Sequence, residues 1–179
     1  MNLSRAFALM LALAPGLMPA AVSAQATTNP SSLREPGEDW VGYVVPPYPS
    51  GWSELSGGCI GSVDDAGGPC HHSITVIRDA QSGMRMILGL EEMKHFGKDP
   101  LWRVVAALEP DALFDRKLDA VHGTCQLHNV EDATVVAIVR YEDREWLRAR
   151  EAWRFDVTAG RLVPLRAADV RCANEGYGE

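Results

Sequence analysis

The 179-residue sequence lacks every short motif that would name a reaction. It has no G-x-S-x-G nucleophile elbow, no S-x-x-K sequence and no context for a free reactive thiol. No glycine-rich loop precedes an expected helix, which excludes the common phosphate-binding loops. The carboxylate pairs Asp64–Asp65 and Glu91–Glu92 lie in polar stretches, where we expect ordinary solvated acids. The sequence therefore predicts a protein that is not an enzyme and that uses no cofactor.

An excess of positive charge is also missing. The chain has 17 Lys and Arg against 24 Asp and Glu, which gives a formal net charge of −7. Nonspecific binding to nucleic acid or to an anionic membrane surface needs a basic face, so this balance opposes both. The same acidity suits a basic protein partner, because opposite potentials steer two proteins together.

The N-terminal apolar run, Ala6 to Ala20, is too short to cross a bilayer, which takes about 20 apolar residues, and it is broken by prolines and a glycine. Arg5 precedes the run, and small residues at Val22 to Ala24 follow it, as in secretory signal peptides. We predict a signal peptide over residues 1–24 with cleavage before Gln25, and no membrane contact afterwards. Cleavage removes one arginine and leaves 16 basic and 24 acidic residues, a charge of −8.

Cysteine is scarce, and its four copies, Cys59, Cys70, Cys125 and Cys172, all lie in the part expected to be exported. An even number in an oxidising compartment predicts two disulfides, for which three pairings are possible. We favour the sequential pairs, which close loops of 12 and 48 residues. The chain-entropy model assigns these loops about 3 and about 4 kcal/mol of stability. A periplasmic or secreted protein is therefore expected.

The mature chain divides into an arm and one domain. Residues 25–39 are polar and carry prolines, so we predict a disordered arm. Residues 40–179 are expected to form a single domain. Within it, residues 40–52 are apolar but rich in proline, which predicts an extended segment over the core or an edge strand. The glycine-rich stretch 56–69 predicts a loop.

Strand signals dominate the rest of the domain. Residues 73–79 and 84–90 predict a hairpin, and residues 101–108 favour a strand, with a helix starting at Asp99 as the alternative. The β-branched run 133–141 predicts a central strand buried on both faces. A last hairpin is expected around the turn Thr158-Ala159-Gly160, with strands at Phe155–Val157 and Arg161–Leu165.

Two segments carry apolar residues at helical spacing, Pro110–Val121 and Glu142–Trp153. Together with the strands they predict an α+β domain: an antiparallel sheet with one or two short helices and two disulfides.

The histidines offer an alternative function. His71, His72, His122 and His128 could serve as ligands of a periplasmic metal-handling protein, since imidazole is a preferred zinc ligand. A disulfide-bonded cysteine cannot join them, and adjacent residues on a strand point to opposite faces. We therefore expect no metal site and keep these four residues as the alternative.

The run YEDREWLRAR, from Tyr141 to Arg150, mixes acids, arginines and aromatic residues. It is typical of a solvent-facing amphipathic helix. Its Trp, Tyr and Arg residues also favour a protein-binding patch, because these types dominate interface hot spots. The expected contact residues are Tyr141, Glu142, Asp143, Glu145, Trp146 and Arg148.

The succession LWRVVAALEPDAL, TCQLHNVEDATVVAIVRY and AWRFDVTAGRLVPLRAADVRCANEGYGE resembles that of uncharacterised small exported proteins of Gram-negative bacteria. The resemblance covers roughly the last 80 residues and implies a periplasmic domain. The chain is also similar in kind to periplasmic immunity proteins and inhibitors that block a toxin or a cell-wall hydrolase. The landmarks of the resemblance are Trp102, Cys125, Trp153, Cys172, Asn174 and Gly176.

Export, acidity, disulfides and the missing catalytic motifs together predict a non-catalytic binding protein. We expect an inhibitor or immunity factor that neutralises a secreted toxin or cell-wall hydrolase, with a basic protein as partner. The alternatives are the metal-handling protein above and a hydrolase of unrecognised type. The hydrolase would need a deep pocket with carboxylate or histidine groups of shifted pKa.

Overall fold

The computed structural model describes residues 37–61, 70–96 and 99–178. All of them belong to the second of two units into which the chain divides, residues 34–179. The expected signal peptide, residues 25–36 of the expected arm and the Asp64–Asp65 pair lie outside the described residues. The end of the expected arm is described, and it enters the first 3₁₀ turn, η1 (Glu38–Trp40).

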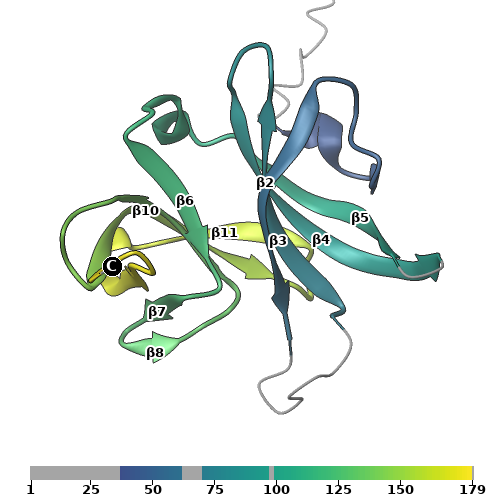
Figure 1. Ribbon diagram of the computed structural model, residues 1–179. Coiled ribbons are helices and arrows are strands. Elements are labelled where there is room, and N and C mark those ends of the chain that lie inside the picture. The colour runs from purple at the N-terminus through teal and green to yellow at the C-terminus, as the bar shows by residue number, and fades with distance from the viewer. Residues whose placement is uncertain (1–36, 62–69, 97–98, 179) are drawn as a thin grey trace, which may run out of the picture. The chain divides into compact units, whose positions relative to one another are not determined.

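The expected α+β class is wrong, because the described residues form almost only β-structure (Figure 1). They contain twelve strands and three 3₁₀ turns of three or four residues. None of these helical turns is long and apolar enough to cross a membrane. The 3₁₀ turns after η1 are η2 (Asp111–Phe114) and η3 (Ala167–Asp169). The strands are β1 (Val44–Val45), β2 (Trp52–Ile60), β3 (His72–Asp79), β4 (Arg85–Phe96), β5 (Asp99–Leu108), β6 (Leu118–His122), β7 (Cys125–Leu127), β8 (Val130–Glu131), β9 (Val135–Arg140), β10 (Trp146–Asp156), β11 (Arg161–Leu165) and β12 (Val170–Ala173).

The first sheet is antiparallel, with the strand order β1–β5–β4–β3–β2. It confirms the predicted hairpin, whose strands are β3 and β4, and the preference for a strand over residues 101–108, which lie in β5. The segment 40–52 contributes the edge strand β1 and packs Trp40, Tyr48 and Trp52 on the core, as expected, whereas Tyr43 is exposed. The expected loop 56–69 is wrong at its start, because residues 56–60 continue β2 and pair with β3.

The second sheet has the order β6–β9–β10–β12–β7–β8, and β11 also pairs with β10. Its strand β9 is the predicted central strand, and the side chains from Val135 to Val139 are all fully buried. The predicted last hairpin is confirmed by the pairing of β10 with β11.

The expected helix over Glu142–Trp153 is wrong, since β10 begins at Trp146 and runs to Asp156. The error has a physical cause in a register shift of β10 against β9 between Ala149 and Glu151. A strand alternates its faces with a period of two, but an extra residue resets this alternation. Ala149 and Ala152 therefore share one face although they are three residues apart, which is a helical spacing.

The expected helix over Pro110–Val121 is also wrong, and is replaced by η2 and β6. The buried guanidinium of Arg85 donates hydrogen bonds to the backbone carbonyl oxygens of Leu113, Asp115 and Leu118. A continuing helix would use these carbonyls for its own i→i−4 bonds. Arg85 of β4 therefore provides hydrogen bonds to carbonyl oxygens of a segment for which the sequence predicted a helix with its own internal hydrogen bonds.

The two sheets pack on each other through a shared apolar core. Its residues come from β3, β4 and β5 of the first sheet and from β6, β9 and β10 of the second. Phe155 is the largest of them, and its ring lies over Gly89, where an added Cβ would approach the ring carbons to 2.7 Å. A second cluster surrounds the Cys125–Cys172 disulfide, and a third covers the far face of the first sheet under Trp40, Tyr48 and Trp52.

Both favoured disulfides are present, Cys59–Cys70 and Cys125–Cys172. Cys125 and Cys172 lie directly opposite each other in the pairing of β7 with β12 and are fully buried. Cys59 lies one residue before the end of the ladder between β2 and β3, and its bridge to Cys70 closes the segment that joins them. Two disulfides are compatible with a protein that works in an oxidising compartment outside the cytoplasm.

Candidate functional site

The predicted contact residues lie on a loop rather than on a helix. Residues 141–145 connect β9 to β10. Trp146 and Arg148 lie at the start of β10, where it pairs with β12. The side chain of Tyr141 is 57% exposed, and the four residues after it are exposed as well. This loop therefore presents most of the predicted contact residues to solvent.

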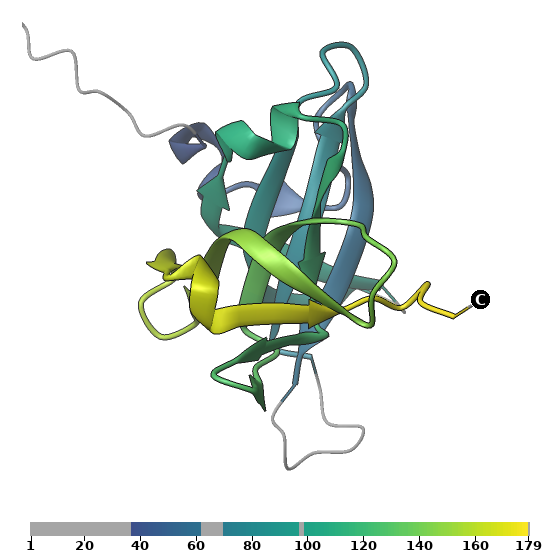
Figure 2. The same cartoon turned by 90° about the vertical axis from the view of Figure 1, so that its left-hand side faces the viewer.

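The C-terminal segment fixes the loop in place. The side-chain amide of Asn174 donates to the backbone oxygens of Glu142 (3.0 Å) and Arg144 (3.1 Å), and its backbone N–H donates to Glu145 O (2.8 Å). Figure 2 shows the yellow C-terminal end of the chain beside the yellow-green loop. The β10–β12 pairing and the Cys125–Cys172 disulfide hold Asn174 at this position. The loop therefore keeps one conformation without a helix.

Loop and C-terminal segment together form a surface that we call the acidic tyrosine patch. Its four acids outnumber its one cation, Arg144, which pairs with Glu142 at 2.6 Å. Burial, followed by the charges of Asp119 and Glu175, raises the pKa of the Tyr141 hydroxyl above its ordinary value. A tyrosine hydroxyl is protonated at neutral pH even without this shift, so it can donate a hydrogen bond to a partner. The acidic tyrosine patch consists of Tyr141, Glu142, Asp143, Arg144, Glu145, Glu175 and Tyr177.

Trp146 does not belong to the acidic tyrosine patch, although it was expected to contact a partner. Its ring is half-buried, and the guanidinium of Arg171 stacks on it at 4.4 Å from the centroid. Arg171 in turn donates two hydrogen bonds to Gln126 Oε1, at 2.9 and 2.8 Å. The tryptophan face is thus already occupied by a cation–π contact within the domain. Arg148, the sixth expected residue, is exposed on β10 next to this stack.

Sequence reasoning missed Glu175 and Tyr177, of which Tyr177 is 50% exposed. They lie 30 or more positions after the loop in the chain, and only strand pairing brings them close to it. The predicted disulfide between Cys125 and Cys172 was the one sequence signal that could have located them near the second sheet.

The four histidines of the metal-handling alternative point to four different places. His71 contacts Glu92 at 3.3 Å, and His128 contacts Asp169 at 3.4 Å. His72 meets the edge of the Phe155 ring, while His122 Nε2 lies 3.2 Å from Ser56 Oγ. In the part of the chain that the structure describes, no three His, Cys, Asp or Glu residues come together as metal ligands. The geometry gives the metal-handling alternative no support.

His122 connects the edges of the two sheets. It lies on β6, and its ring covers Gly58 of β2, where an added Cβ would come within 2.8 Å of Nδ1. Burial lowers the pKa of His122 below its ordinary value of 6.5, and the charges of Glu54 and Glu175 oppose this only in part. The imidazole is therefore neutral at pH 7.

This lowered pKa predicts a loss of stability in mild acid. The unfolded chain binds the His122 proton more readily than the folded chain, so the contribution is complete above the unfolded pKa and is lost as the pH falls through the folded pKa. We expect the free energy of unfolding, measured with urea, to fall between about pH 7.5 and about pH 5.5, before most carboxylates titrate. His122→Gln should fall less over this interval. An equal fall in both proteins would contradict the role of His122.

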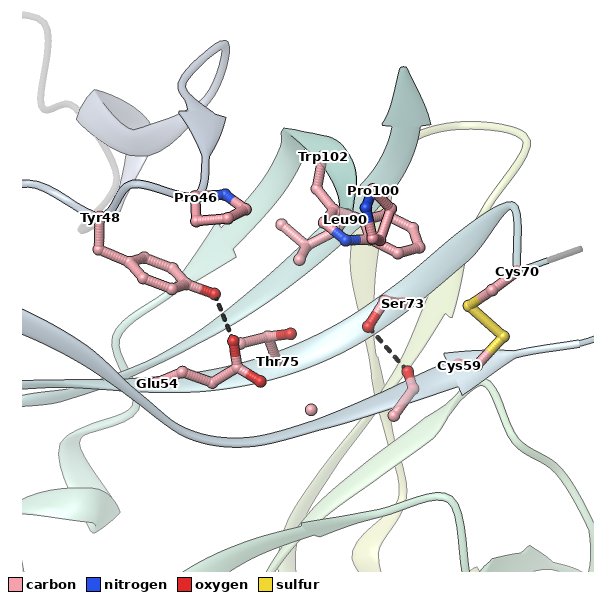
Figure 3. A pocket seen from close by; sticks show the side chains of 12 residues that line it. Pro46, Tyr48, Glu54, Cys59, Cys70, Ser73, Thr75, Leu90, Pro100 and Trp102 are labelled. Atoms are coloured by element: carbon pink, nitrogen blue, oxygen red, sulfur yellow. Dashed lines mark hydrogen bonds between the residues drawn. A yellow bond between two sulfur atoms is a disulfide. The ribbon is translucent and has the colours of Figure 1, made fainter. Parts of the chain in front are cut away.

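A pocket of about 380 Å³ lies on the far face of the first sheet (Figure 3), and sequence reasoning did not predict it. Tyr48, Glu54 and Trp102 are among its lining residues, and its described lining includes no histidine. Burial, followed by the hydrogen bond and charge of Glu54, raises the pKa of the Tyr48 hydroxyl far above its usual range. The titratable groups of this lining are thus Tyr48 and Glu54, which form one hydrogen-bonded pair.

Comparison with known proteins does not assign the chain to a family. No protein-family description matches the chain, and neither a curated protein nor a solved structure shows significant similarity to it.

Proposed function

We propose that this protein is a non-catalytic binding protein, an inhibitor or immunity factor that neutralises a secreted toxin or a cell-wall hydrolase outside the cytoplasm. The observation that carries the proposal is the acidic tyrosine patch, which is exposed, acidic and held in one conformation by Asn174. The strands β10 and β12 of the second sheet and the Cys125–Cys172 disulfide support this patch.

The charge of the acidic tyrosine patch suits a basic partner. Four carboxylates and one arginine leave a formal charge of −3, counted as 1 − 4, on a single surface. Such a surface accelerates encounter with a basic protein and repels acidic ones. Glu142 is paired with Arg144, whereas Asp143, Glu145 and Glu175 form no ion pair among the described residues. These three carboxylates therefore carry most of the attraction.

Tyr141 and Tyr177 are the expected anchors of the interface. Tyrosine supplies a large contact area with few rotatable bonds, which is why it dominates many binding surfaces. The loop needs little ordering on binding, because the hydrogen bonds from Asn174 already fix its backbone. A prefixed loop loses less conformational entropy on association, so more of the contact energy remains as affinity.

The test begins with the mature chain as bait in periplasmic extracts and in extracts of toxin-secreting competitors. A basic lysozyme serves as the defined probe for inhibition of cell-wall lysis. The double variant Asp143→Asn/Glu145→Gln should weaken binding to the captured partner by about tenfold or more, mainly through slower association. Tyr141→Ser/Tyr177→Ser should weaken it to a similar degree through faster dissociation.

The matched control is Asp111→Asn/Glu131→Gln, which also removes two exposed carboxylates but lies outside the acidic tyrosine patch. It should bind within about twofold of the wild-type chain. The proposed role of the acidic tyrosine patch would be refuted by a partner that binds Asp143→Asn/Glu145→Gln as tightly as the control variant. An association rate that does not depend on salt would refute it as well.

A further inference from the structure

The pocket on the first sheet has one apolar wall and one polar wall. Tyr48, Pro46, Trp102, Pro100 and Leu90 line the first side in Figure 3, and the strands β2 and β3 form the second. Gly57 of β2 lies in this second wall, and because it has no side chain the space between Glu54 and Thr75 stays open. A volume of about 380 Å³ is within the range of small-molecule sites.

Glu54 is the one charged residue among the described residues that line this pocket. The Tyr48 hydroxyl donates a hydrogen bond to Glu54 Oε2 at 2.7 Å and thereby orients the carboxylate. The other oxygen, Oε1, lies over Gly57, since a Cβ added there would come within 2.6 Å of it and within 3.1 Å of Thr75 Oγ1. Oxygen Oε1 of Glu54 therefore lies over Gly57, close to the hydroxyl of Thr75.

The charge of Glu54 has no counter-ion within the described part of the chain. No described Lys or Arg forms an ion pair with it. The nearby His122 is neutral at pH 7 because it is buried. An anionic ligand would be repelled from this pocket, whereas a cation would compensate the carboxylate. Two aromatic rings, those of Tyr48 and Trp102, border the same hollow and can attract a cation by their π-faces.

We propose that this pocket binds a small organic cation with an alkylated ammonium group. Its positive charge compensates Glu54, while its methyl groups contact Tyr48, Trp102 and the two prolines. The ligand is free in solution rather than a lipid head group, because a phosphate next to the ammonium group would be repelled by Glu54 and by the net charge of −7. The pocket shares no residue with the acidic tyrosine patch, so this site is independent of the proposed partner binding.

Choline and its neutral carbon isostere 3,3-dimethylbutan-1-ol provide the test, since they share shape and differ in charge. Both are titrated into the mature chain by calorimetry and by amide NMR. Choline should bind and shift the amide signals of Gly57, Gly58 and Thr75. The isostere should bind at least about tenfold more weakly, because it lacks the attraction to Glu54 and to the rings.

Glu54→Gln keeps an acceptor for the Tyr48 hydroxyl and removes the charge, so it should weaken choline binding by about tenfold or more and leave the isostere unaffected. Glu131→Gln is the matched control and should bind choline as the wild-type chain does. Equal binding of choline and the isostere, undiminished choline binding by Glu54→Gln, or no choline binding to the folded chain would overturn the proposal. Cosedimentation with phosphatidylcholine vesicles would overturn the assignment to a free cation.

Discussion

Replacing Cys125 and Cys172 together with alanine should lower the free energy of unfolding by about 4 kcal/mol. The bridge closes a loop of 48 residues, counted inclusively from a separation of 47, and so restricts the unfolded chain more than a short loop does. Both cysteines are fully buried opposite each other in the β7–β12 ladder, where alanine leaves no unpaired polar group. Urea unfolding of the two proteins at the same pH measures the difference.

The Cys59→Ala/Cys70→Ala variant is the comparison, because its loop has only 12 residues, from a separation of 11. The same model gives it a loss of about 3 kcal/mol. If this shorter bridge contributed more than the longer one, restriction of the unfolded chain would not explain the stability. A reducing agent should lower the free energy of unfolding of the wild-type chain as much as replacing all four cysteines does.

Arg85→Met should destabilise the domain by about 3 kcal/mol, as much as we expect for the loss of the Cys59–Cys70 bridge. The side chain of Arg85 is only 12% exposed, and it donates hydrogen bonds to the carbonyl oxygens of Leu113, Asp115 and Leu118. Methionine fills similar space but donates nothing, so three carbonyls lose a partner at about 1 kcal/mol each. The ion pair with Asp119 contributes less, since that carboxylate is half exposed.

Arg78 lies opposite Arg85 in the β3–β4 ladder and is exposed, which makes Arg78→Met a matched control. It should change the free energy of unfolding by less than about 0.5 kcal/mol. Urea unfolding of both variants decides the question. A loss at Arg85 no larger than that at Arg78 would show that the carbonyls of η2 and β6 do not depend on the guanidinium.

The sequence best predicts strands in which every residue is buried to the same degree. The run Val135 to Val139 is β-branched or small throughout, and it forms a strand buried on both faces. The favoured pairing of the cysteines is confirmed as well, and each of the two bridges joins cysteines that follow one another in the chain. Turns with Gly83 and Gly160 at positive φ mark the two predicted hairpins.

Both helix predictions failed because a spacing of three or four residues has more than one cause. In β10 a register shift near Arg150 produced that spacing within a strand. Between Pro110 and Val121, hydrogen bonds from Arg85 replaced those of a helix. The spacing of apolar residues along the sequence reveals neither the register shift nor the hydrogen bonds from a distant strand.

The candidate site divides in the same way. The sequence alone determined that the segment from Tyr141 to Glu145 is acidic and carries an aromatic residue of a type common in interfaces. The basic partner that this acidity predicts stays a prediction. Only the tertiary structure decided which of these residues are available. Strand pairing places Glu175 and Tyr177 beside the loop, and Arg171 covers Trp146. The physical reason is that side-chain chemistry belongs to each residue, whereas proximity and exposure depend on contacts between residues far apart in the chain.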